Sequence, residues 1–266
     1  MTTLIIAEKP AQARDFAAAL GISKSGPGFI ELKDGSLITW AIGHLLELVA
    51  PADYDEAWAK WNWATLPMVP EPFKMRASER TKTHFKLVQA LVKKATRIVI
   101  ATDAGREGEL IGREILEVCK FKGAVDRLWC SSMTPADIRK AFGALIPGVQ
   151  KEPLWEAAKA RQHADWLIGL NMTRGVTLAA REAGALAVGR VKTPTLAMVV
   201  RRDKQIAGFK AQEFYEIEAT VSTAKGETFK MLHAPAEDQR ITAKADAEAR
   251  LKRAEKFSGP IRMENT

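Results

Sequence analysis

Residues 97–116 read RIVIATDAGREGELIGREIL, and this stretch decides the fold class of the chain. Residues 98–101 (IVIA) form a short apolar run rich in β-branched side chains, which is typical of a strand buried on both faces of a parallel sheet. The run ends in small and polar residues that favour a tight turn, and apolar residues then recur at helical spacing from Leu110 onward. We therefore predict a strand, an acidic turn and a helix. Asp103 would lie at the carboxyl end of the strand, where open α/β sheets place their sites.

A second unit of the same kind begins the chain. Residues 4–7 (LIIA) are again typical of a buried strand, and they lead into Glu8, Lys9 and Pro10, a residue that suits the first turn of a helix. If the two strands are parallel neighbours, Glu8 and Asp103 share one rim of the sheet. Such a pair of carboxylates suits Mg²⁺, which prefers oxygen ligands and keeps several waters. Acids at a helix start also have an ordinary explanation, because the helix dipole favours them there.

The two units together resemble the Toprim domain. Residues 102–109 (TDAGREGE) are similar to the TDxxREGE form found in type IA DNA topoisomerases, and residues 4–10 (LIIAEKP) are similar to the opening of the topoisomerase III branch. The resemblance implies a Rossmann-like parallel sheet and a Mg²⁺ site made by Glu8, Asp103 and Glu107. Many members of the family carry aspartate at the position of Gly105, so the choice between one and two metal ions stays open.

The composition narrows the class of protein. The chain has 266 residues, of which 47% are hydrophobic and 27% charged, as in soluble globular proteins, and its formal net charge of +8 favours a polyanionic partner. No apolar run approaches the roughly 20 residues that a membrane span needs, and the N-terminus has no signal-peptide layout. The two cysteines form no CxxC pair, which favours a reducing compartment. We expect a cytoplasmic monomer without a membrane partner.

Composition and periodicity divide the chain into three predicted domains. They are an α/β domain (1–150), a helical domain (151–213) and an incomplete β-rich domain (214–266); the resemblance makes the first a Toprim domain and the second a DNA-binding domain. Residues 214–222 alternate with period two, which is typical of a half-buried strand. Residues 128–130 (LWC) are expected to add a strand to the first domain, and another strand is expected from Ile261 onward.

The loop after the long helical stretch carries a phosphate-binding pattern. Thr193 is a good N-cap and Pro194 a good first helical residue, so a helix over residues 194–202 would point its free N–H groups at a loop with two cations. The segment resembles the GRVQTP motif of type IA topoisomerases, with lysine where glutamine is usual. The resemblance implies DNA contacts by six consecutive residues: Ala187, Val188, Gly189, Arg190, Val191 and Lys192.

Further residues are candidates for the same surface. Asn171 and Arg174 share one stripe of a long predicted helix, and the spacing is equally compatible with a phosphate-binding face and a solvated face. Trp61 is one of three tryptophans within six residues, which more often pack locally than stack on bases; the family resemblance favours it as a DNA neighbour. His44 lies in a GHL segment similar to one near the family's cleft, and is otherwise a structural histidine.

The resemblance also implies roles in strand breakage. Glu8 would handle the proton on the leaving 3′ oxygen, as general acid and then base, while Lys9 and Arg190 would stabilise charge on the phosphate. The family's nucleophile is a tyrosine of a later domain, and neither Tyr54 nor Tyr215 has its flanking residues. We therefore expect a truncated chain that binds Mg²⁺ and single-stranded or underwound DNA without cutting it alone.

Two other functions remain open at this stage. A non-catalytic DNA-binding module that kept the Toprim shape would fit Gly105 and the missing tyrosine. A Toprim nuclease would instead cut DNA with Mg²⁺ and without any tyrosine.

Overall fold

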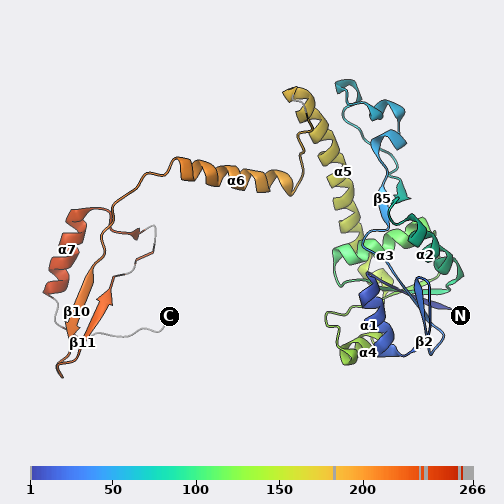
Figure 1. The fold of residues 1–266 in the computed structure, drawn as a ribbon, viewed down its shortest axis with the longest axis horizontal. Helices are drawn as coiled ribbons and strands as arrows, with labels where there is room; N and C mark the ends of the chain where they lie inside the picture. The colour runs from blue at the N-terminus through green and yellow to red at the C-terminus, as the bar shows by residue number, and fades with distance from the viewer. Residues whose placement is uncertain (1, 182–183, 234, 237–238, 257–258, 260–266) are drawn as a thin grey trace. The chain divides into compact units, whose positions relative to one another are not determined.

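The computed structural model describes residues 2–181, 184–233, 235–236, 239–256 and 259. They form two compact units, divided between Leu196 and Ala197, and each is considered separately below. The first unit holds the sheet and the long helix α5, and the second holds a hairpin and the helix α7 (Figure 1). The domain boundaries expected near residues 150 and 213 stay predictions.

A seven-stranded sheet forms the centre of the first unit, in the order β2-β3-β4-β1-β7-β8-β9. Its strands are β1 (Thr3–Ala7), β2 (Ile22–Gly26), β3 (Phe29–Leu32), β4 (Leu37–Trp40), β7 (Arg97–Ala101), β8 (Ala124–Arg127) and β9 (Ile146–Pro147). The four central strands pair in parallel, from β4 through β1 and β7 to β8, and antiparallel strands extend both edges. The predicted α/β class with a Rossmann-like parallel sheet is confirmed.

The two strands expected to carry the acids are direct neighbours in this sheet. Their parallel register pairs Thr3 with Arg97 and Ala7 with Ala101. Glu8 and Asp103 follow these last paired residues within two positions, so both lie at the carboxyl edge of the sheet. This is the edge at which open α/β sheets place their sites.

Helices cover both faces of the sheet, which explains why its central strands are apolar throughout. On one face, α2 (Lys82–Lys94) and α3 (Arg106–Val118) pack against a core that includes Leu4, Ile6 and Ile98. On the other face, α1 (Pro10–Leu20) and α4 (Pro135–Phe142) pack against a core that includes Ile5 and Val99 (Figure 1). Successive side chains of a strand point to opposite faces, so each central strand contributes side chains to both cores.

The helix α5 (Glu152–Ala180) packs against α3 and extends beyond the sheet. There it contacts a long segment of the chain, residues 46–77, which we call the excursion. This excursion contains β5 (Leu46–Leu48), β6 (Met75–Ala77) and the short 3₁₀ turns η1 (Pro51–Asp53), η2 (Glu56–Ala59) and η3 (Trp63–Thr65); a further turn, η4 (Gly148–Lys151), precedes α5. The indole of Trp166 donates a hydrogen bond from Nε1 to the carbonyl of Val49 at 3.2 Å, which fastens the excursion to α5.

The second unit contains β10 (Glu218–Ser222), its antiparallel partner β11 (Thr228–Leu232) and α7 (Lys244–Glu255). The predicted strand over 214–222 is thus shorter than expected, because Tyr215 pairs with Ile241 in an isolated bridge instead of continuing β10. The strand expected from Ile261 onward lies outside the described residues.

Two further sequence predictions differ from the structure at specific residues. The strand expected at 128–130 is wrong, because the strand is β8, which ends at Arg127, a charged residue that is fully buried. The helix expected to begin at Pro194 is α6 (Lys192–Ala207), which begins two residues earlier. Thr193 therefore lies within the first turn, and its hydroxyl accepts a hydrogen bond from the N–H of Gly189 at 3.1 Å.

Candidate active site and nucleic-acid interface

The carboxyl ends of β1 and β7 bring Glu8 and Asp103 together. The Glu8 carboxylate accepts a hydrogen bond from the N–H of Asp103 at 2.9 Å. The ammonium group of Lys9 lies 3.6 Å from Asp103 Oδ2. The shared rim that the sequence predicted is therefore present, with a cation beside it.

A third side chain, Gln12, completes this contact, and no sequence pattern pointed to it. Its Oε1 accepts from the N–H of Glu8 at 2.8 Å, and its Nε2 donates to Asp103 Oδ1 at 2.9 Å. Gln12 is only 6% exposed. The buried amide thus joins the first turn of α1 to the acidic turn after β7.

Glu107 faces the same rim from the first turn of α3, but its carboxylate already has partners. Its carboxylate forms an ion pair with Arg161 of α5 and lies 3.7 Å from Nε2 of His44. His44 Nδ1 lies 3.1 Å from the buried carboxylate of Glu114, and this hydrogen bond raises the pKa of His44 although burial opposes it. His44 therefore lies at the site and is tied into its acids.

These groups surround a hollow of about 330 Å³, which we call the acidic hollow. It is lined by residues 103–108 of the acidic turn and helix start, together with Glu8 and Arg161. All three acids predicted to bind metal, Glu8, Asp103 and Glu107, line this one hollow. The position of Gly105 adds no carboxylate to it.

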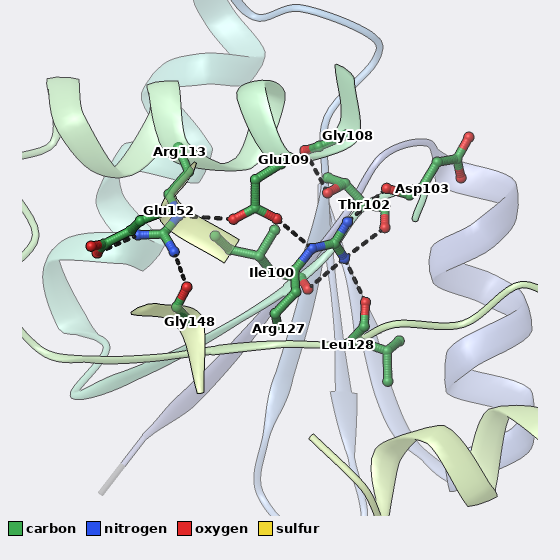
Figure 2. A network of polar contacts seen from close by, with 10 residues as sticks. All are labelled: Ile100, Thr102, Asp103, Gly108, Glu109, Arg113, Arg127, Leu128, Gly148 and Glu152. Atoms are coloured by element: carbon green, nitrogen blue, oxygen red, sulfur yellow. Dashed lines mark hydrogen bonds and ion pairs between the residues drawn. The ribbon is translucent and has the colours of Figure 1, made fainter. Parts of the chain in front are cut away.

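Arg127, at the end of β8, holds the backbone of the acidic turn (Figure 2). Its guanidinium donates to the carbonyls of Ile100, Thr102, Leu128 and Asp103 at 3.0, 2.9, 2.5 and 2.6 Å. It also donates from Nε to the carboxylate of Glu109 at 2.6 Å. Burial lowers the pKa of Arg127, and the Glu109 carboxylate works against that shift.

Glu109 continues the network to a second arginine. Arg113 Nε donates to Glu109 Oε1 at 3.0 Å, and its NH1 lies 3.4 Å from the carboxylate of Glu152 at the start of α5. Both Arg127 and Glu109 are 0% exposed. Figure 2 shows the Asp103 carboxylate pointing away from this network. The network therefore holds the backbone of the turn, while the carboxylate of Asp103 lies at the rim.

Gly108 lets the start of α3 lie against the turn. A Cβ built on Gly108 would overlap the carbonyl oxygen of Asp103. The hydroxyl of Thr102 donates to the Gly108 carbonyl at 2.6 Å, which closes the turn from the other direction. Any larger residue at position 108 would therefore displace the turn that carries Asp103.

The loop of residues 187–192 packs on α5. Thr173 Oγ1 accepts from the N–H of Val188 at 2.9 Å and lies 3.3 Å from its carbonyl oxygen. Arg190 meets Asp165 through two nitrogens, at 3.0 and 3.2 Å, and this contact lowers the pKa of the Asp165 carboxyl. Asp165 of α5 therefore positions Arg190, and its carboxylate compensates the charge of the exposed guanidinium.

A groove of about 600 Å³ runs between β5, α5 and this loop. Ala187, Val188 and Lys192 line it from the loop, while apolar side chains such as Trp166 line it from α5. A smaller hollow of about 150 Å³ connects this region to the acids, because it is lined by Glu107 and Arg161 as well as by Asp165. The acidic hollow and the loop of residues 187–192 thus border one continuous surface of the first unit.

Asn171 and Arg174 lie on α5 where they hold the 58–68 segment. The Asn171 amide accepts from the N–H of Met68 at 2.6 Å and donates to the carbonyl of Met68 at 2.9 Å. Arg174 is 6% exposed, donates to the carbonyl of Trp58 at 2.7 Å and lies 5.5 Å from the ring centre of Trp61. Trp61 itself is 40% exposed. DNA contact by these three residues stays a prediction.

The donor set of the acidic hollow fits a hydrated Mg²⁺ better than an enclosed metal. Across the part of the chain that the structure describes, no group of three or more His, Cys, Asp or Glu side chains is close enough to hold a metal ion. Mg²⁺ needs only one or two carboxylates, because it keeps several of its waters. Asp103 and Glu8 supply such a pair, with the Lys9 ammonium group 3.6 Å from Asp103, whereas Glu107 is in direct contact with the guanidinium of Arg161.

Comparison with known proteins identifies the class. A family model described as the Toprim domain matches residues 3–133, and a model described as DNA topoisomerase matches residues 149–265. The full-length topoisomerase I of Thermotoga maritima has a similar fold, with a TM-score of 0.61 and 20% identity over 96% of this chain and 37% of that one. The chain belongs to the type IA DNA topoisomerases.

Within this family, the chain is similar to proteins named DNA topoisomerase 3. It is 45% identical to the one from Bacillus cereus over 221 residues, which cover 82% of this chain and 30% of that protein. It is 41% identical to the one from Vibrio cholerae, over 85% of this chain and 36% of that protein. The chain therefore spans about a third of the length of these relatives. Among the described helices, none is long and apolar enough to cross a membrane.

Proposed function

We propose that this chain forms the Mg²⁺- and DNA-binding part of a topoisomerase of the DNA topoisomerase 3 kind, which breaks and rejoins one strand. One observation carries the proposal: the Glu8–Asp103 rim and the loop of residues 187–192 border the same surface of the first unit. Phosphate-binding cations and proton-transferring acids on one surface are the groups that phosphodiester exchange requires.

The chain's own residues divide the chemistry between them. Glu8, whose carboxylate accepts the Asp103 N–H, gives a proton to the leaving 3′ oxygen and takes it back on rejoining. Lys9 and Arg190 stabilise the negative charge of the phosphate. Asp103, Glu8 and Glu107 are the candidates to hold Mg²⁺, which when bound would neutralise charge on the phosphate oxygens.

The nucleophilic tyrosine is proposed to come from outside this sequence. Tyr54 lies on the excursion between β5 and β6, where its hydroxyl accepts from the N–H of Lys74 at 2.7 Å and lies 3.3 Å from the Lys74 carbonyl. Tyr215 belongs to the second unit, where it pairs with Ile241. Neither tyrosine is among the residues that line the acidic hollow.

Single-stranded DNA is the proposed ligand, and its binding should weaken steeply with salt. The logarithm of the binding constant should fall against the logarithm of salt concentration by about 0.7 for each phosphate contact. Replacing Arg190 with alanine should reduce that slope by about 0.7, because one contact is lost. Fluorescence anisotropy of a labelled oligonucleotide between low and moderate salt measures this.

Arg97→Ala is the matched control for that experiment. Arg97 begins β7, at the opposite end of the strand from the acidic turn, where it is paired with Asp126 at 2.6 Å. Its loss should leave the slope unchanged. Equal slopes for the Arg190 and Arg97 variants would contradict the proposed interface.

Gly105 favours one alternative, a DNA-binding module without catalysis. A module would bind the oligonucleotide in the same salt-dependent way but would need neither Glu8 nor a metal ion. A Toprim nuclease would shorten single-stranded DNA in the presence of Mg²⁺ without forming any covalent protein adduct. Incubation of the chain with a labelled strand and Mg²⁺ separates the nuclease from the other two.

A further inference from the structure

Gln12 closes a ring of hydrogen bonds between two segments that are far apart in sequence. Glu8 donates its N–H to Gln12 Oε1, Gln12 donates through Nε2 to the Asp103 carboxylate, and Asp103 donates its N–H back to the Glu8 carboxylate. The three bonds measure 2.8, 2.9 and 2.9 Å. Both polar atoms of the Gln12 amide are used, and its side chain is buried.

Asp103 stands between two hollows, so the direction of its carboxylate matters. One is the acidic hollow, and the other, of about 300 Å³, is lined by Lys9, Gln12 and Cys130 among others. Side-chain torsion alone would let an exposed aspartate turn toward either hollow, because its terminal torsion is broad. The Gln12 amide removes this freedom by holding Oδ1.

We propose that Gln12 is a positioning residue for the metal site, which rests on the function proposed above. It holds Asp103 Oδ1, so Oδ2, which lies 3.6 Å from the Lys9 ammonium group, is the oxygen that would meet a divalent cation. It also ties this orientation to the backbone of Glu8, so both acids of the rim are set together. Residues that orient metal ligands in this way typically change metal affinity by about 10- to 100-fold when they are replaced.

The experiment is a titration of the 266-residue chain with Mn²⁺, which replaces Mg²⁺ and whose free ion is counted by electron paramagnetic resonance. Gln12→Leu keeps a similar volume and removes both hydrogen bonds. Its Mn²⁺ dissociation constant should rise about 10-fold or more. Competition with Mg²⁺ should show the same ratio between the variant and the unchanged chain.

Thr39→Val is the matched control, because Thr39 is equally buried and donates one hydrogen bond, to the carbonyl of Gly28 at 2.9 Å. It should lower thermal stability without changing Mn²⁺ affinity. If Gln12→Leu lowers stability as the control does but binds Mn²⁺ within twofold of the unchanged chain, Gln12 is merely structural and the inference fails. Should Gln12→Leu not fold, Gln12→Met takes its place, because the methionine side chain is unbranched like that of glutamine. Its thermal stability and Mn²⁺ affinity are then judged by the same criteria.

Asp103→Asn separates this inference from the function on which it rests. Loss of Mn²⁺ binding in Asp103→Asn, together with weakened binding in the Gln12 variant, supports both. Unchanged binding in Asp103→Asn would place the metal elsewhere and overturn the proposed site, whatever Gln12 does. If Asp103→Asn loses Mn²⁺ binding while the Gln12 variant binds Mn²⁺ as the unchanged chain does, only the role of Gln12 is overturned.

Discussion

Replacing Arg127 with methionine is expected to lower the free energy of unfolding by about 3–5 kcal/mol, measured by urea denaturation at neutral pH. Removing one partner of a buried ion pair is costly because the other charge stays in the interior without compensation. Here the carboxylate of Glu109 would keep only Arg113, and four backbone carbonyls would lose the Arg127 guanidinium, although that of Ile100 keeps a second donor, the N–H of Leu128. Buried carbonyls without partners add to the cost.

The double variant with Glu109→Leu tests whether the two side chains act together. Because the second change also removes the carboxylate that lost Arg127, the pair of changes should cost less than the sum of the two single ones, by about 0.5–3 kcal/mol. Lys82→Met is the control, since Lys82 forms an exposed ion pair with Glu79 and its loss should cost about 0–1 kcal/mol. A cost below about 1 kcal/mol for Arg127→Met would show that the network does not hold the turn.

Glu8→Gln should abolish most of the strand exchange in a complete enzyme. We expect a fall of about 10²- to 10⁴-fold when this chain, joined to the remaining part of the Bacillus cereus relative, is assayed for relaxation of DNA. The amide oxygen of glutamine still accepts the Asp103 N–H, so the fold of the rim is retained and only the proton is lost. Binding of single-stranded DNA should be unchanged or slightly tighter, because one negative charge is removed.

Glu117→Gln is the matched control for Glu8→Gln. Glu117 lies near the end of α3 and pairs with Lys159, and it is not among the residues that line the acidic hollow. Its activity should equal that of the unchanged enzyme. A Glu8→Gln enzyme that retains activity within about tenfold would remove Glu8 from the chemistry and leave the DNA-binding module as the better account.

The sequence was sufficient to predict the centre of the fold. Residues 4–7 and 98–101 are apolar at every position, a pattern that is typical of a parallel strand covered on both faces. Since parallel strands end at the same edge, the meeting of Glu8 and Asp103 followed without knowledge of any contact.

What the sequence could not supply are partnerships between distant segments. Arg127 looks like an exposed charge within a weak strand, and only the approach of Glu109 from α3 and the carbonyls around it make its burial possible. Asn171 and Arg174 fit a phosphate-binding stripe by spacing, whereas their hydrogen bonds go to the backbone of residues 58 and 68. Gln12 sits on the inner side of α1 and resembles any polar helix residue until its two partners are known.

The path of the DNA tests the central claim most directly. A single-stranded oligonucleotide that carries photoreactive thymines should be cross-linked to the chain, and the attached peptides should be identified by mass spectrometry. We expect attachment within residues 187–192 and at the carboxyl ends of β1 and β7, in a manner that high salt suppresses. Cross-links confined to the second unit, or to the edge strands β2 and β3, would contradict the claim that the acids and the Arg190 loop form one DNA site.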